Sequence, residues 1–186
     1  VTAIHGHVDG LINNAGIIQP FVTINELTLD QIHRVMDVNF YGTLHMVKAF
    51  LPRLLERPEA HIANVSSMGG FLPVPGQIAY GASKAAVTLL SEGLYAELTD
   101  TPVGVSVILP GGIATDIVRN SNVEFSGGGG DAGMSMLSAG EAADLILTAI
   151  EKNKRKVYIG KDSKTMHTLY SLAPKRALRM IKKAMG

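Results

Sequence analysis

The stretch Tyr80-Gly81-Ala82-Ser83-Lys84 decides how the rest of the sequence is interpreted. It lies near the start of a segment, Ala79 to Leu98, in which small and apolar residues recur without a proline. Such a pattern predicts a long helix that is buried along much of its surface. Residues four apart share one helix face, so Tyr80 and Lys84 can reach the same ligand. A nearby ammonium favours the tyrosinate and lowers the phenol pKa from about 10, which makes Tyr80 a candidate proton donor or acceptor.

Short apolar runs and helical patterns alternate on both sides of this stretch. Strands are expected at Val8 to Ile12, His61 to Val65, Val103 to Leu109 and Lys156 to Gly160. Helices are expected from Thr28 to about Arg57 with a kink near Gly42, from Ala79 to Leu98, from Ser138 to about Asn153, and after Pro174. Thr28 and Ser138 each precede a Gln or Glu by three residues, which is the capping-box spacing. The alternation predicts one domain with a doubly wound, Rossmann-like α/β fold around a parallel sheet.

Polar and glycine-rich segments follow three of the expected strands. They are residues 13–16, 66–70 and 110–115. In a sheet of this class ligands bind beyond the carboxyl ends of the strands, so these segments should share one rim. Ser67 could then hydrogen-bond the substrate oxygen that Tyr80 protonates. Two simpler interpretations stay open: Asn13 and Asn14 could form a turn through their own side chains, and Pro110-Gly111 could only terminate a strand.

Several motifs occur together in a fixed order. They are Asn13-Asn14-Ala15-Gly16, Asn39 within Val38-Asn39-Phe40, Ser67 thirteen residues before Tyr80, the Tyr80 to Lys84 stretch, and Pro110-Gly111-Gly112-Ile113-Ala114-Thr115. This set resembles the short-chain dehydrogenase/reductase family over about Val8 to Lys161. The resemblance implies an oxidoreductase that uses NAD or NADP to interconvert an alcohol and a carbonyl. It also implies a small-molecule substrate and a homo-oligomer, without choosing among steroids, sugars, acyl chains and small ketones.

The resemblance assigns a role to individual residues. Tyr80 would be the general acid in carbonyl reduction and the base in alcohol oxidation, and Ser67 would polarise the carbonyl. Lys84 would hold the nicotinamide ribose and depress the tyrosine pKa. Asn39 would sit at the helix break and hold a water that links Lys84 to solvent, or would simply be a helix-breaking residue with a backbone partner. The implied cofactor contacts come from Asn14, Ala15, Gly16, Tyr80, Lys84, Pro110, Gly111, Ile113 and Thr115. Ser66 competes with Ser67, and the spacing to Tyr80 selects Ser67.

One feature of the family is missing from the sequence. The glycine-rich turn that cradles the cofactor pyrophosphate is expected before Asn13, together with two βα units, and the run Gly127 to Gly130 follows no strand. Because the first residue is Val1, the chain is expected to be truncated at its N-terminus and to expose a strand edge. The residue that separates NAD from NADP would lie in the absent part. The alternative function is therefore a catalytically silent fragment or interaction module that cannot bind the dinucleotide alone.

Composition excludes other classes of protein. With 186 residues, 46% of them hydrophobic and 18% charged, the chain can form one ordinary globular core. A net charge of +1 gives no overall field that favours nucleic acid or an anionic membrane. The absence of cysteine excludes disulfides, and with no membrane-length apolar run the expected location is the cytoplasm. No metal is expected, because His33, His45 and His61 lack the spacing of a metal site.

Two segments invite interpretation beyond this core. Residues 116–140 are rich in Gly and Ser and are predicted to be a mobile substrate lid, in which Met134, Met136 and Leu137 either cover the substrate or belong to a disordered loop. Residues 174–186 predict a helix with one apolar and one basic face. Such a helix lies on an anionic membrane, packs against a subunit, or is an ordinary terminal helix, of which the last is preferred here.

Overall fold

Four parallel strands form the central sheet of the computed structural model, which describes residues 2–123 and 136–185. The strands are β1 (Gly10–Asn13), β2 (Ala60–Val65), β3 (Val103–Pro110) and β6 (Lys156–Ile159), in the order β1-β2-β3-β6. Leu11 pairs with Ile62, Ile62 with Val105, and Ile108 with Val157. All four expected strands are confirmed, although the first begins two residues later than expected.

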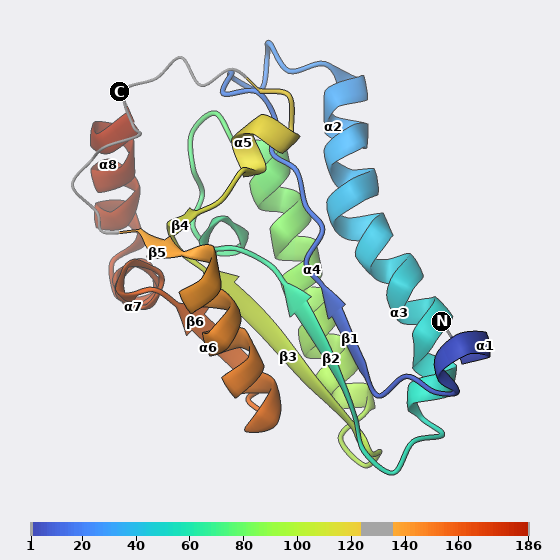
Figure 1. Ribbon diagram of the computed structural model, residues 1–186. Coiled ribbons are helices and arrows are strands. Elements are labelled where there is room, and N and C mark those ends of the chain that lie inside the picture. The colour runs from blue at the N-terminus through green and yellow to red at the C-terminus, as the bar shows by residue number, and fades with distance from the viewer. Residues whose placement is uncertain (1, 124–135, 186) are drawn as a thin grey trace.

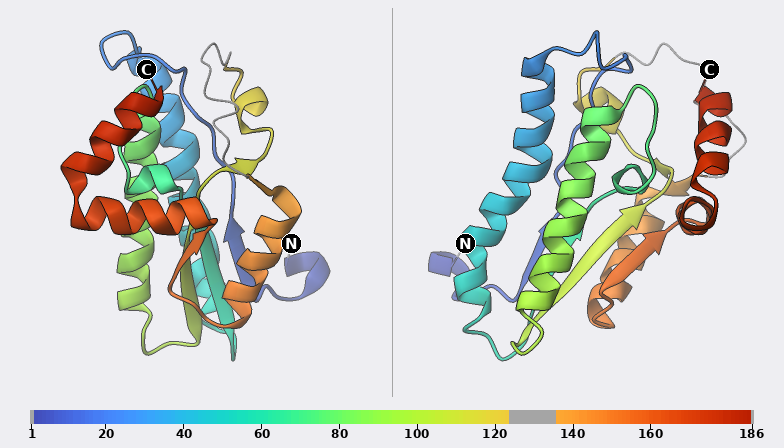
Figure 2. Two further views of the ribbon diagram at one scale, coloured as in Figure 1. Left: turned by 90° about the vertical axis from the view of Figure 1, so that its left-hand side faces the viewer. Right: turned by 180° about the vertical axis from the view of Figure 1, so that it is seen from behind.

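Helices cover both faces of the sheet. The long helix α4 (Ile78–Glu97) and α3 (Gly42–Leu54) lie on one face, and α6 (Ala139–Glu151) lies on the other (Figure 1, Figure 2). The doubly wound class predicted from the sequence is therefore confirmed. The first apolar cluster packs α3 and α4 on the sheet, and its buried members are Leu11, Val47, Leu54, Ala60, Ile62, Leu94, Leu98, Val103 and Val105. A second cluster packs α6, with Ile108, Ala142, Ala149 and Ile159.

The helix expected from Thr28 is interrupted once. Thr28 and Gln31 form the predicted capping box at the start of α2 (Leu29–Met36). A π-helical turn, Asp37–Tyr41, then connects α2 to α3, immediately before Gly42. A π-turn inserts an extra residue into the helical ladder and rotates the side chains that follow, and such turns are frequent at functional sites. The predicted break is thus confirmed, and it carries Asn39.

The start of α4 is held by a residue that is distant in sequence. Gln77 stands at the N-cap of α4 but forms no side-chain capping bond. Instead Gln19, which is 1% exposed, accepts through Oε1 from the backbone N–H groups of Ala79 and Tyr80 at 2.7 and 3.1 Å. Its Nε2 donates to the Gly76 carbonyl at 2.9 Å. Gln19 therefore satisfies first-turn donors that every helix leaves unpaired, and it positions the backbone of Tyr80.

Regular elements lie at both ends of residues 116–140, the segment predicted to be a substrate lid. Residues Ile117–Asn120 form α5, and Ile113–Ala114 (β4) pairs with Leu137–Ser138 (β5). The Ser138 and Glu141 capping box then starts α6 at Ala139, as predicted. Hydrogen bonds of Ser121 explain why Ile117–Asn120 is helical. Ser121 Oγ accepts from the Ile18 N–H, which is distant in sequence, and donates to the Ile117 carbonyl. Met134 and the run Gly127 to Gly130 lie outside the described residues, and the role as a lid stays a prediction.

Two helices end the chain. No element was expected at α7 (Lys161–Leu172), where the apolar residues are too sparse to give a clear helical pattern. The terminal helix α8 (Pro174–Met185) is confirmed and packs mainly on α7. A 3-10 turn (Met68–Gly70) and a short helix, α1 (Thr2–His5), complete the described structure. No helix within the described ranges has the length and apolar character that crossing a membrane requires.

Replacing Gln19 tests its capping of α4. Gln19→Ala leaves two N–H groups and the Gly76 carbonyl without their partner in a buried place, so the free energy of unfolding should fall by about 2–3 kcal/mol. Thr28→Ala, which removes an exposed cap of α2, is the control and should lower it by about 1 kcal/mol. Urea unfolding measures both, and an equal loss in the two variants would contradict the assignment.

Candidate active site

A cavity of about 670 Å³ opens at the carboxyl ends of the strands. Its walls include every residue that the sequence predicted to contact a cofactor, namely Asn14, Ala15, Gly16, Tyr80, Lys84, Pro110, Gly111, Ile113 and Thr115. Ser67 also lines it, whereas Asn39 does not. An apolar side is supplied by Ile12, Val65, Ile117, Ile146 and Leu147. Segments from three strand ends and from α4 and α6 therefore converge, as expected for ligand sites in parallel sheets.

Tyr80 and Ser67 form one polar pair on the cavity wall. Burial raises the pKa of the Tyr80 phenol above its usual 10, and a hydrogen bond with the Ser67 side chain partly opposes that shift. Ser67 Oγ also accepts from the Gly69 N–H at 3.0 Å, which fixes the hydroxyl at the start of the 3-10 turn. Ser66 points elsewhere, since its Oγ donates to the Lys84 carbonyl at 2.7 Å. The structure thus brings Ser67, rather than Ser66, to Tyr80.

Lys84 is a buried cation with a single protein acceptor within the described ranges. It is 3% exposed, and its Nζ donates to the Val65 carbonyl at 2.9 Å. Burial lowers the pKa of Lys84 from 10.5 to about 8. An ammonium has three N–H donors, so two of them have no protein acceptor in that part of the chain. These donors are available to a ligand in the cavity.

The prediction that Lys84 lowers the pKa of Tyr80 stays a prediction for the site with a bound ligand. The pKa of Tyr80 is raised, because burial outweighs the hydrogen bond from Ser67. The ammonium of Lys84 is instead directed to the Val65 carbonyl. Helical spacing by four correctly placed both residues on one wall, but it did not predict which acceptor the ammonium would select. The phenol is therefore protonated at neutral pH.

Asn39 connects three segments through its side-chain amide. It is 0% exposed, and its Oδ1 accepts from the Ile17 N–H at 2.8 Å while Nδ2 donates to the Ile17 carbonyl and to Ser83 Oγ, both at 2.9 Å. Ser83 Oγ donates in turn to the Tyr80 carbonyl at 2.7 Å. The geometry gives Asn39 a positioning function for the segment after β1 and for α4. The water that would link Lys84 to solvent stays a prediction.

Gly16 lies close to Lys84 and Asn39 where these segments meet. A Cβ on Gly16 would lie 3.0 Å from Lys84 Nζ and 3.5 Å from Asn39 Oδ1. The distance to Lys84 Nζ is shorter than ordinary van der Waals contact, so a side chain at position 16 would require the ammonium to shift by a few tenths of an ångström. The neighbouring Asn13 does not form the turn considered from the sequence. It is the last residue of β1, and its Nδ2 donates to Asn64 Oδ1 at 2.8 Å.

The segment Pro110 to Thr115 is fixed from behind by residues that sequence reasoning missed. Asp162 accepts the Gly112 N–H at 2.6 Å, and Ser163 Oγ donates to the Leu109 carbonyl at 2.7 Å. Both follow Gly160, which ends the β6 region with a φ of +92°. In the sequence, the only signal of this arrangement is Gly160 directly after an expected strand, because glycine at such a place can indicate a turn with positive φ. Gln19 and Ser83 were also missed as positioning residues, because their partners are set by tertiary structure.

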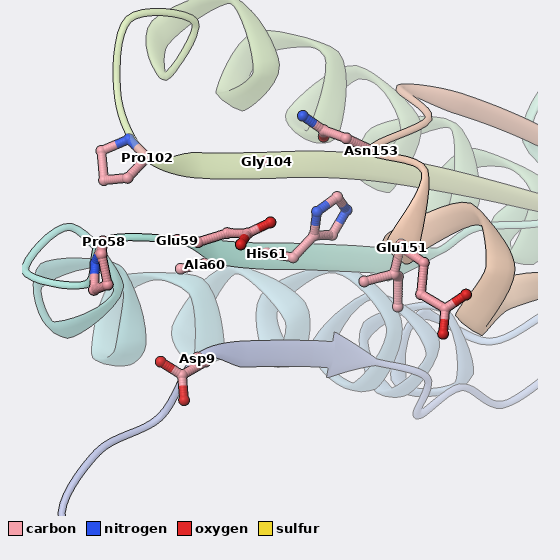
Figure 3. A pocket seen from close by; sticks show the side chains of 10 residues that line it. Asp9, Pro58, Glu59, Ala60, His61, Pro102, Gly104, Glu151 and Asn153 are labelled. Atoms are coloured by element: carbon pink, nitrogen blue, oxygen red, sulfur yellow. The ribbon is translucent and has the colours of Figure 1, made fainter.

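A second cavity, of about 470 Å³, lies at the amino ends of the strands (Figure 3). Its wall includes His61, whose Nε2 is 2.8 Å from Ser106 Oγ. Since Ser106 Oγ donates to the Lys154 carbonyl at 2.6 Å, His61 is the donor in this pair. Burial lowers the pKa of His61, which favours the neutral ring. His61 therefore has the role of a satisfied structural histidine that joins β2 to β3.

Known proteins resemble this chain in sequence and in structure. The chain is 34% identical over 163 residues to 1-deoxy-11-beta-hydroxypentalenate dehydrogenase of Streptomyces avermitilis, a match that covers 86% of this chain and 58% of that protein. It is 34% identical over 180 residues to dehydrogenase/reductase SDR family member 7B of Rattus norvegicus, covering 95% of this chain and 55% of that protein. The chain thus spans little more than half the length of these relatives.

The same relationship appears in three dimensions. A short chain dehydrogenase from Burkholderia cenocepacia, solved in complex with NADP, superposes with a TM-score of 0.77 and 30% identity. The superposition covers 92% of this chain and 68% of that one. The family model for short chain dehydrogenases matches residues 1–124 of the 186, and this chain therefore belongs to the short-chain dehydrogenase family.

Proposed function

We propose that this chain supplies the proton-transfer group and the nicotinamide-side wall of an oxidoreductase that uses NAD or NADP to interconvert an alcohol and a carbonyl. The observation that carries the proposal is the meeting of Tyr80, Ser67 and Lys84 on the wall of one cavity. The NADP complex of the Burkholderia relative supports a nicotinamide dinucleotide as the ligand.

The cavity has the chemistry that such a cofactor needs. Lys84 offers two N–H donors beyond its bond to Val65, and paired ribose hydroxyls are suitable acceptors. Gly16 brings backbone close to Lys84 without a side chain between them, which leaves room for a sugar. Ile12, Ile113 and Ile146 supply an apolar surface for a ring. When bound, the nicotinamide supplies or accepts the hydride, and the protein provides orientation and proton transfer.

In the cavity without a ligand, the protonation state of Tyr80 favours carbonyl reduction over alcohol oxidation. A raised pKa keeps the Tyr80 phenol protonated, which is the form that a general acid needs. Ser67, already bonded to that phenol, would donate to or align the same substrate oxygen. Alcohol oxidation would require the pKa of Tyr80 to fall, and a charged Lys84 near the bound ligand would act in that direction.

The first test is titration of the 186-residue chain with NADPH and NADH, followed by nicotinamide fluorescence. Lys84→Ala should weaken binding at least tenfold, because it removes the buried donor. Tyr80→Phe should leave the affinity within about twofold and lower turnover of a ketone panel at least 100-fold, because it removes the hydroxyl that transfers the proton. Equal effects of both variants on affinity would argue against separate roles.

Binding should also depend on pH through Lys84. Its pKa of about 8 means that the ammonium is present below pH 8 and is lost as the pH rises above it. Ligand binding to the ammonium takes up a proton there, so NADPH affinity should fall by up to about tenfold per pH unit above 8. Lys84→Met, which cannot titrate, should be insensitive to pH, and the wild-type affinity should approach it at high pH. Parallel curves for the two proteins would refute the assignment.

A folded chain that binds neither dinucleotide would favour the second candidate, a silent fragment or interaction module. The observation behind that candidate is that β1 pairs only with β2 among the described strands and leaves Ile12 48% exposed. Circular dichroism on the titrated sample establishes that the chain is folded. Light scattering on the same sample shows whether it self-associates through that open edge.

A further inference from the structure

Asp162 is held against three glycines at the tip of the sheet. Its carboxylate accepts the Gly112 N–H at 2.6 Å. A Cβ on either Gly111 or Gly160 would overlap that carboxylate. Gly160 also has a φ of +92°, which L side chains rarely adopt, and this turn places Asp162 in the first turn of α7. The close contact therefore exists only because glycine occupies both positions.

The carboxylate belongs to a larger connection between two strand ends. The Gly111 N–H donates to the Ile159 carbonyl at 2.8 Å, and Ser163 Oγ donates to the Leu109 carbonyl at 2.7 Å. With the Asp162 bond, three hydrogen bonds join the end of β3 to the β6–α7 junction. Pro110 and Gly111 line the cavity, whereas Asp162 does not. Asp162 thus acts on the cavity wall from behind.

We propose that Asp162 is a positioning residue that holds residues 110–113 in the geometry needed to receive the nicotinamide. This inference rests on the proposed function. The bond to Gly112 is a charge-assisted hydrogen bond to a backbone donor, which is stronger than a neutral one. It fixes the direction of the chain immediately before β4, where Ile113 faces the cavity. Loosening it would misplace Ile113 and Thr115 together.

The test is a double-mutant cycle at Asp162 and Gly111, measured by NADPH affinity and by urea unfolding. Asp162→Ala should weaken NADPH roughly tenfold. Asp162→Asn, whose amide oxygen can still accept from Gly112 but carries no charge, should lose less affinity than Asp162→Ala. Gly111→Ala should weaken binding on its own, yet add nothing in the Asp162→Ala background, because the overlapping carboxylate is gone.

Each outcome decides the proposal. Additive losses, or an unchanged affinity in Asp162→Ala, would overturn it. A purely structural role would lower the unfolding midpoint of Asp162→Ala while leaving the affinity of the folded protein unchanged, which would also overturn it. If the wild type binds no dinucleotide, the proposed function is contradicted instead. The contact of Asp162 with residues 110–113 would then be tested by whether the effects of the two substitutions on the unfolding free energy are non-additive.

A second inference comes from the charge of α8 and does not depend on the cavity. Five basic residues and no acidic residue occupy positions 174–186, namely Lys175, Arg176, Arg179, Lys182 and Lys183. Across the part of the chain that is described, none of the five forms an ion pair. The other residues of the chain comprise 12 basic and 16 acidic ones, so positive charge is concentrated on α8.

Exposed apolar side chains border this basic strip. Ala177 is 0% exposed, but Leu178 is 40% exposed, Met180 is 50% exposed, and Leu172 just before the helix is 82% exposed. Among residues 174–183, the preferred interpretation of an ordinary packed helix therefore holds for Ala177 but not for Leu178 and Met180. In Figure 1, α8 stands at the side of the molecule opposite β1, and among the described helices and strands the views show none outside it.

We infer that α8 is a docking surface for an anionic lipid bilayer. Basic residues are attracted to anionic headgroups, and apolar residues at the border of the strip can enter the interface between headgroups and acyl chains. A nucleic acid would use the charges but gain nothing from Leu178 and Met180. A second copy docked through the same helix would place like charges against each other.

Vesicle co-sedimentation of the 186-residue chain tests this surface. The chain should bind vesicles of phosphatidylcholine with 30% phosphatidylserine, less so at high salt, and should not bind phosphatidylcholine alone. Lys175→Glu, Arg179→Glu and Lys182→Glu together should reduce binding at least tenfold. The control, Lys48→Glu, Lys152→Glu and Lys154→Glu, makes the same charge change at exposed sites elsewhere and should bind normally.

Three results would contradict the proposal that α8 docks on an anionic bilayer. The first is equal binding by the two triple variants. The second is binding to a DNA oligonucleotide without binding to the vesicles. The third is a change of oligomeric state in the α8 variant, measured by light scattering, in a protein that does not sediment with vesicles.

Discussion

The side-chain amide of Asn39 is the interaction on which the candidate site depends. It pairs with both backbone groups of Ile17 and donates to Ser83, and Ser83 donates to the Tyr80 carbonyl. The segment after β1, the π-turn and α4 are thereby held at fixed distances from one another. An amide that is 0% exposed must keep all its partners, because an unpaired polar group is costly in the interior. The π-turn delivers Asn39 to this place, since it shifts the side chain relative to a regular helix.

Burial has opposite consequences for the two titratable groups of the cavity. It raises the pKa of Tyr80 and lowers that of Lys84 to about 8, so both shifts favour the neutral form. The two pKa values therefore move apart, and the pKa of Lys84 falls below that of Tyr80. A ligand that accepts hydrogen bonds from the ammonium would stabilise its charge, and that charge would in turn favour the tyrosinate.

The rim of the cavity is built by contacts from outside it. Gln19 holds the first turn of α4, and Asp162 holds the segment after β3, yet neither lines the cavity. Both act on backbone groups that have no partner within their own element, namely the first N–H groups of a helix and the N–H of a residue beyond a strand end. Family membership is shown by the match to residues 1–124, and the positioning contacts extend as far as α7.

The sequence by itself predicted the strands of the central sheet, most of the long helices and part of the cavity wall. Apolar runs predicted the four parallel strands, and capping boxes located the starts of α2 and α6. The Tyr80 to Lys84 stretch and its companion motifs, apart from Asn39, selected residues that line one cavity. Each of these patterns lies within a short stretch of sequence, so it can be recognised without knowing which distant residues pack against it. Tertiary structure alone decided the rest: the acceptor of Lys84 Nζ, the direction of the Tyr80 pKa shift, the order of Ile117–Asn120, and the roles of Gln19 and Asp162. The physical reason is that hydrogen-bond partners and burial are set by residues distant in sequence, which no local pattern specifies.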